Sequence, residues 1–180
     1  MFGGIAGETM AEWVVANGGA RIPDEDAIKS EMERAQRPFT RKGGDINRLR
    51  ETLLDAMWED VGVIRDAAGL KRGLSKLDAI EGELLAAGVP DGDRAFNLTW
   101  HDWLNLRSLV EISKVIALAA LKRENSRGAH FREDFPGEGD LATSAYTVAR
   151  QREGTPDISE RPVKFTIVKP GQSLLKEAAE

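Results

Sequence analysis

Three long stretches of helical periodicity, joined by short links, constrain the fold of this chain more than any other feature. They cover residues 45–65, 69–87 and 95–124. In each, apolar residues recur every three or four positions, a spacing that gathers them on one face of an α-helix. The third stretch is apolar on most sides, which is typical of a central, buried helix. Because short links favour antiparallel neighbours, the pattern predicts a three-helix bundle that resembles a spectrin repeat.

Two further helices are expected before the bundle. Residues 5–15 are small and apolar and predict a buried helix, which ends at Asn17 and the two glycines after it. A second helix begins near Asp24, whose carboxylate can cap it, and ends at Pro38, because proline disfavours helical backbone at the residue before it.

The chain changes character after Ser126, where glycine and proline become frequent and the helical period is lost. Residues 144–148 and 163–168 are rich in β-branched and aromatic side chains and predict two short strands that pair as a hairpin. The expected fold is therefore mainly α. It has N-terminal helices over residues 1–44, a three-helix bundle over 45–125, and a loop and β-hairpin extension over 126–180.

The composition excludes several kinds of site. The 180 residues include no cysteine, which rules out disulfides, cysteine-bound zinc, a chain-held iron–sulfur cluster and thiol catalysis. The two histidines, His101 and His130, lie far apart without a third ligand, so we expect no metal site. A net charge of −5 argues against nucleic acid as a partner, because phosphates attract basic surfaces. No apolar run reaches the roughly 18–20 residues that span a bilayer.

No self-contained active site is present, so we assign no catalytic residue. The sequence lacks a P-loop and a nucleophile elbow. His101 and Asp102 are adjacent on a helix and do not face each other, so we expect His101 to be a surface or boundary residue. The basic stretch from Arg34 to Arg50 is interleaved with acids and is typical of a solvated or docking face.

The stretch from Ser126 to Pro136 carries the most chemistry. Gly128 permits a backbone turn that other residues avoid. Two arginines supply forked donors for carboxylates, phosphates or carbonyls, and a histidine can exchange a proton near neutral pH. The candidate site residues are Ser126, Arg127, Gly128, His130 and Arg132.

Two interpretations of this stretch stay open. In the first, it is a loop that contacts a cofactor, a substrate or a partner. In the second, it locks the end of the preceding helix, with its arginines paired to Glu133 or Asp134 and to the last helical carbonyls.

The same stretch closely resembles a signature of the succinate dehydrogenase/fumarate reductase flavoprotein family, which includes L-aspartate oxidase. Residues 126–136 are similar to the motif SRGAH-x-R-x-D-[FY]-P of that family. Residues 57–65 resemble its M-W-x-x-x-G-[IV]-x-R helix, and residues 2–7 resemble the FG-x-x-AG start of the last helix of its FAD-binding domain. The three matches occur in the family's order and together cover most of residues 1–136.

The resemblance implies that this chain is the C-terminal helical domain of a longer flavoprotein oxidoreductase. The residues that hold FAD and substrate would lie upstream, so FAD would belong to the full-length protein, and we expect the isolated chain to bind no cofactor and to be inactive. The expected partners are the FAD-binding domain, an iron–sulfur or other electron-transfer subunit, and a second copy of the chain. No nucleic acid partner is expected. The expected location is cytoplasmic, with association to the membrane through a complex.

At two places the sequence departs from the family motifs, so the subgroup of the family to which it is similar stays open. Asn125 stands where the family usually has glutamate, and residues 137–141 lack the Asp-Asp that usually leads to a Trp and a His. A soluble oxidase or reductase therefore remains an alternative to a respiratory enzyme.

Two alternative functions do not depend on the resemblance to this family. One is a free-standing helical module that binds another protein through an edge formed by Trp100 and Trp103. The other is a nucleic-acid binder that uses the stretch from Arg34 to Arg50. Salt would weaken the binding of nucleic acid to that stretch.

Overall fold

The computed structural model describes residues 2–19 and 22–173. These residues belong to two compact units, Met1–Gln36 and Arg37–Glu180. The first unit holds the two N-terminal helices, and the second holds the remaining helices and all four strands of the described chain.

The two N-terminal helices form where the sequence predicts them, as α1 (Phe2–Asn17) and α2 (Glu25–Gln36). The Asp24 carboxylate caps α2, because its Oδ1 accepts the backbone N–H groups of Asp26 and Ala27. The prediction that the first helix is buried was wrong, since no residue of α1 is buried. Burial requires a facing apolar surface, and the unit to which α1 belongs does not provide one.

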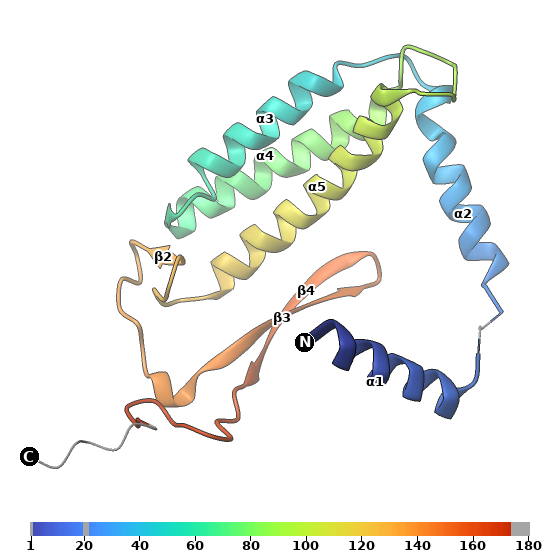
Figure 1. Ribbon diagram of the computed structural model, residues 1–180. Helices are drawn as coiled ribbons and strands as arrows, with labels where there is room; N and C mark the ends of the chain where they lie inside the picture. The colour runs from blue at the N-terminus through green and yellow to red at the C-terminus, as the bar shows by residue number, and fades with distance from the viewer. Residues whose placement is uncertain (1, 20–21, 174–180) are drawn as a thin grey trace, which may run out of the picture. The chain divides into compact units, whose positions relative to one another are not determined.

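The three-helix bundle consists of α3 (Ile46–Glu59), α4 (Ala67–Ala86) and α5 (Leu98–Lys122), which lie side by side in Figure 1. Each helix begins at a capping side chain, namely Asp45, Asp66 and Asn97, which accepts a backbone N–H three residues on. The helices share a core of large aliphatic residues and one tryptophan. Its buried members include Ile46, Leu49, Leu53, Leu77, Ile80, Leu84, Trp103, Leu106 and Val110.

The first helix of the bundle is shorter than its periodicity suggests. Helix α3 ends at Glu59, and Ile64–Arg65 forms strand β1, which pairs in parallel with β2 (Phe131–Arg132). The prediction of helix up to residue 65 was therefore wrong over residues 60–65. A Cβ at Gly62 would lie 2.5 Å from the carbonyl oxygen of Trp58, and the β-branched residues around Gly62 favour extended backbone.

Helix α5 is less enclosed than its composition suggests. One face is buried, but Leu109, Ile112 and Ile116 are 43%, 58% and 45% exposed. The prediction of a central helix that is buried on most sides was wrong for this second face, because three helices in one bundle cover only part of each other.

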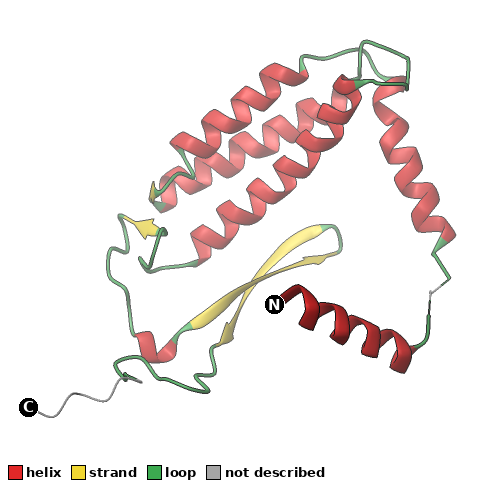
Figure 2. Cartoon of the chain, viewed as in Figure 1, coloured by secondary structure: helices red, strands yellow, loops and turns green. Residues whose placement is uncertain are grey.

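The C-terminal hairpin is formed by β3 (Ala145–Arg152) and β4 (Thr155–Pro162), which pair antiparallel and contact α5 (Figure 2). The predicted hairpin is confirmed, but its second strand is not residues 163–168. Glu153 and Gly154 take positive φ values of 49° and 82°, so a two-residue turn sends the chain back directly after β3. Pro156, which strands tend to avoid, hid this strand from the sequence pattern.

Two short 3₁₀ helices complete the described elements, η1 (Arg37–Thr40) before α3 and η2 (Leu141–Thr143) before the hairpin. The mainly helical class with a small C-terminal sheet is confirmed. Over residues 2–19 and 22–173, no helix combines the length and apolar character needed to cross a membrane.

Candidate functional site

Ser126 holds together the loop that follows α5. Its Oγ accepts the backbone N–H of Arg132 at 2.9 Å and donates to the carbonyl oxygen of Phe135 at 2.8 Å. Its own N–H donates to the carbonyl oxygen of Gly137 at 2.9 Å. The hydroxyl and the backbone N–H of one buried serine therefore close the stretch from residue 126 to residue 137 onto itself.

A tight turn occupies the first part of this loop. The backbone N–H of Arg127 donates to the carbonyl oxygen of His130 at 2.9 Å, and the N–H of His130 donates back to Arg127 at 3.2 Å. Gly128 lies between them with φ of 59°, in the left-handed region. The predicted role of Gly128 as a residue for special backbone geometry matches this turn.

Arg132 is the most buried charged residue of the loop, with 1% of its surface exposed. Its Nη1 donates to three carbonyl oxygens at the end of α5, those of Ala120, Leu121 and Arg123, at 2.9, 3.1 and 3.0 Å. These carbonyls lack partners within the helix, so Arg132 acts as a cap for the C-terminus of α5.

The other two nitrogens of the Arg132 guanidinium bind Asp134. Nε and Nη2 donate to the two carboxylate oxygens, each at 2.7 Å, in a bidentate ion pair. Asp134 Oδ2 also accepts the N–H of Ala67, the first residue of α4, at 3.0 Å. The hydrogen bond from Arg132, followed by that from Ala67, lowers the pKa of Asp134 to about 2.

Arg127 faces the opposite direction, toward the segment that leads into β3. Its Nε donates to the carbonyl oxygen of Glu138 at 2.6 Å, Nη1 to Ser144 Oγ at 2.8 Å, and Nη2 to the carbonyl oxygen of Asp140 at 3.1 Å. The helix-lock interpretation thus describes Arg132 and Asp134 correctly, whereas Arg127 binds the following loop.

His130 lies between two arginines that sequence reasoning missed. Arg65 Nη1 is 3.4 Å from His130 Nδ1, and His130 Nε2 is 3.4 Å from the carbonyl oxygen of Arg123. Burial lowers the pKa of His130, and the positive charges of Arg123, Arg65 and Arg132 lower it further. The imidazole is therefore neutral at pH 7, with Nδ1 as an acceptor toward Arg65.

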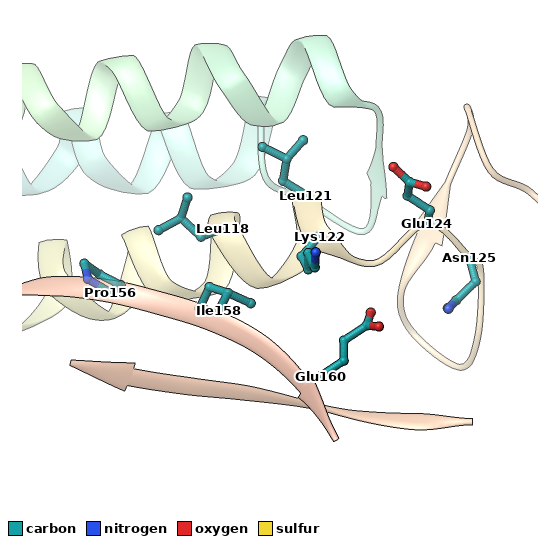
Figure 3. Close-up of a pocket in the computed structure, with 8 residues that line it drawn as sticks. All are labelled: Leu118, Leu121, Lys122, Glu124, Asn125, Pro156, Ile158 and Glu160. Carbon is teal, nitrogen blue, oxygen red and sulfur yellow. The ribbon is translucent and has the colours of Figure 1, made fainter. Parts of the chain in front are cut away.

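A pocket lies between the end of α5 and β4 (Figure 3). Its volume is about 650 Å³. The lining mixes aliphatic side chains with charges of both signs and consists of Leu118, Leu121, Lys122, Glu124, Asn125, Pro156, Ile158 and Glu160. The sequence did not indicate this pocket, because β4 was placed later in the chain.

One of the two tryptophans of the proposed docking edge is not available to a partner. Trp103 is 1% exposed, and its Nε1 donates to the carbonyl oxygen of Leu84 at 3.0 Å. The hypothesis of an interaction module that binds through Trp100 and Trp103 was therefore wrong, because Trp103 is part of the core. His101 is exposed, as predicted. Within residues 2–19 and 22–173, no three His, Asp or Glu side chains gather in a way that could hold a metal ion.

Residues 50–174 match the family described as "Fumarate reductase flavoprotein C-term". The fumarate reductase flavoprotein subunit of Mycobacterium tuberculosis is 27% identical over 182 residues, which cover 97% of this chain and 31% of that protein. The succinate dehydrogenase flavoprotein subunit of Coxiella burnetii is 34% identical over 144 residues, which cover 79% of this chain and 24% of that protein. The chain thus spans about a third or less of the length of these relatives.

The fold has solved counterparts in enzyme complexes. A structure of quinol–fumarate reductase with menaquinol molecules matches with a TM-score of 0.78 and 25% identity. The match covers 92% of this chain and 30% of the other.

Proposed function

Because this chain belongs to the succinate dehydrogenase/fumarate reductase flavoprotein family and corresponds to its C-terminal region, we propose that it serves as a docking domain for the FAD-binding part of such an enzyme. In this role it packs against the FAD-binding domain and does not catalyse a reaction by itself. The observation that carries the proposal is the extent of the match, which covers nearly the whole chain but only 31% of a flavoprotein relative.

The N-terminus of α4, the described α-helix that follows a strand, is a poor site for a dinucleotide. Strand β1 is only two residues long, and the α4 N-terminus that follows it is already occupied by carboxylates. Asp66 Oδ1 accepts the N–H of Gly69 at 2.6 Å, and Asp134 Oδ2 accepts the N–H of Ala67. A pyrophosphate at this helix end would meet two negative charges instead of open N–H groups. We therefore propose that FAD belongs to the full-length protein and that this chain alone binds none.

Helix α1 is the surface that we assign to the FAD-binding domain. Its apolar side chains are exposed in this chain, with Met10 at 62%, Trp13 at 52% and Val14 at 48%. A helix with this much exposed apolar surface gains free energy by packing against another protein surface. In the absence of the FAD-binding domain, the same surface would promote self-association of the chain.

The remaining assignments follow from the kind of complex that the relatives form. We propose an iron–sulfur or other electron-transfer subunit as a second partner, and a cytoplasmic location at the membrane surface through that complex. Residues 1–44, 45–125 and 126–180 are the proposed parts of the chain. Within the last part, Ser126, Arg127, Gly128, His130 and Arg132 form the proposed motif nearest to the cofactor or partner.

A binding experiment tests the docking role. A flavin-loaded fragment that contains the FAD-binding domain should bind the purified chain, and Trp13→Asp should abolish that binding. Leu54→Asp is the matched control, because Leu54 is 54% exposed on α3. A fragment that ignores the wild-type chain, or a purified chain that carries its own flavin absorbance, would overturn the proposal.

A further inference from the structure

A second cavity, of about 480 Å³, lies where the end of α5 meets β1 and the loop at residues 127–130. Four basic side chains line it together with small or aliphatic ones and Thr147. The lining residues that matter here are Arg65, Arg123, Arg127, His130, Ile116 and Ala119. No aspartate or glutamate lines the cavity.

The positive charges around this cavity are not neutralised by the part of the chain that the structure describes. Arg65, Arg123 and Arg127 take part in none of its ion pairs. Two acids of the same region have their contacts elsewhere. Asp134 is bound by Arg132 and Ala67, and Glu124 lines the separate pocket against β4.

Donor groups remain unused at the cavity. Arg65 Nε is buried and has no hydrogen-bond partner among the described residues. The guanidinium of Arg123 donates through Nη2 to Asn125 Oδ1 at 3.2 Å and otherwise faces no acceptor that the structure describes. Each guanidinium nitrogen of Arg127, in contrast, already donates to the segment that follows. A buried guanidinium nitrogen without an acceptor is costly, so an anionic ligand would relieve an existing deficit.

We propose that this cavity binds a carboxylate group, with Arg65 and Arg123 as its principal donors. A planar carboxylate matches the forked geometry of guanidinium groups. Ile116 and Ala119 form an apolar wall, and such walls strengthen ionic hydrogen bonds by excluding water. The neutral imidazole of His130 accepts from Arg65 and so holds that side chain in place at the cavity.

The carboxylate has two possible sources, which experiments distinguish. It can be a small free carboxylate, or it can be an aspartate or glutamate side chain of the FAD-binding fragment. The second source rests on the proposed docking function, whereas the first does not.

The first experiment is an NMR titration of the purified chain with glutarate, with chloride at equal ionic strength as the comparison. We expect saturable shifts of the backbone amides of Ala119, Ala129 and His130. Arg65→Gln and Arg123→Gln should each weaken glutarate binding about tenfold, the loss expected when one charge-assisted hydrogen bond is removed. Arg50→Gln, an exposed arginine of α3 outside the cavity, should leave the titration unchanged.

The second experiment measures binding of the FAD-binding fragment to the same variants. If glutarate does not bind but Arg65→Gln and Arg123→Gln weaken the fragment complex, the cavity binds a protein carboxylate. If the fragment fails to bind the wild-type chain, the docking function is wrong. The glutarate titration alone then tests whether the cavity binds a carboxylate. If the fragment binds all variants equally and glutarate does not bind, the carboxylate site is overturned while the docking function stands.

Both variants must be folded for these results to count. The side chains of Arg65 and Arg123 make one long hydrogen bond each, at 3.4 and 3.2 Å, so neither variant should unfold at a much lower temperature than the wild type. Because the two arginines lie on different elements, misfolding of one variant leaves the other as an independent test.

Discussion

The Arg132 guanidinium and the Asp134 carboxylate form a bidentate pair that joins the end of α5 to the start of α4. Both nitrogen–oxygen distances are 2.7 Å. The remaining nitrogen of Arg132 caps the carbonyls of α5, and one oxygen of Asp134 caps the N–H of Ala67. Two residues of one loop thus bind backbone groups that have no partner within their helices, at the C-terminus of α5 and the N-terminus of α4. The helix dipole favours a cation at the first of these ends and an anion at the second, and Arg132 and Asp134 match this order.

Replacement of Arg132 should strongly destabilise the chain. Arg132→Met removes the positive charge and all five hydrogen bonds of the side chain, and it leaves the carbonyls of Ala120 and Leu121 without this donor. We expect a loss of about 3 kcal/mol in the free energy of unfolding, as is typical when one partner of a buried ion pair is removed. Urea denaturation measures this loss. Arg50→Met, at an exposed site, should change stability by less than about 0.5 kcal/mol, and an equal effect in both variants would contradict the capping role.

The Asp134 pair predicts a loss of stability in acid. The pKa of this carboxyl in the folded chain is about 2, below its ordinary value of 3.8. Its stabilising effect is therefore fully present only well above pH 3.8, and it is lost as the pH falls from 3.8 through about 2. The difference in unfolding free energy between the wild type and Asp134→Asn should shrink over this range, as measured by urea titrations at several pH values. A difference that stays constant from pH 6 down to pH 2 would rule out the pair as its source.

The parts of the fold that the sequence predicts well are those that depend on local pattern. Helices α3, α4 and α5 follow from apolar periodicity and from capping residues such as Asp45 and Asn97, which act within one turn. The β1–β2 pair could not be predicted, because Ile64 fits both a last helical turn and a strand. Only its backbone partner Phe131, far along the chain, decides between the two.

The candidate site divides in the same way. The side chains of Arg132 and Asp134 are close in sequence, so their pairing was one of the two interpretations that the residues allowed. Arg65 and Arg123 could not be assigned, since their approach to His130 depends on how the loop folds back over α5. Residue types alone do not show which of several arginines lacks an acceptor.

The left-handed backbone conformation at Gly128 favours glycine over other residue types. Gly128→Ala should cost about 1 kcal/mol, because φ is 59° there and a Cβ disfavours this conformation. No atom lies within 4 Å of the position that a Cβ would take, so the cost is one of backbone strain and not of collision. Gly92→Ala is the matched control, with the same open space and an ordinary φ. Equal unfolding free energies for the two variants would show that the turn does not require glycine.

The indole N–H of Trp103 should contribute measurably to the stability of the bundle. Trp103→Phe keeps an aromatic ring in the core but removes the donor to the carbonyl oxygen of Leu84. The buried carbonyl then lacks this donor, and part of the volume of the indole is lost, so we expect about 2 kcal/mol of destabilisation in urea. Trp58→Phe provides the comparison, because Trp58 is 79% exposed on α3 and its replacement should be nearly neutral. If the two substitutions lower the free energy of unfolding equally, Trp103 does not lie in the core. The argument against a docking edge formed by the tryptophans would then fail.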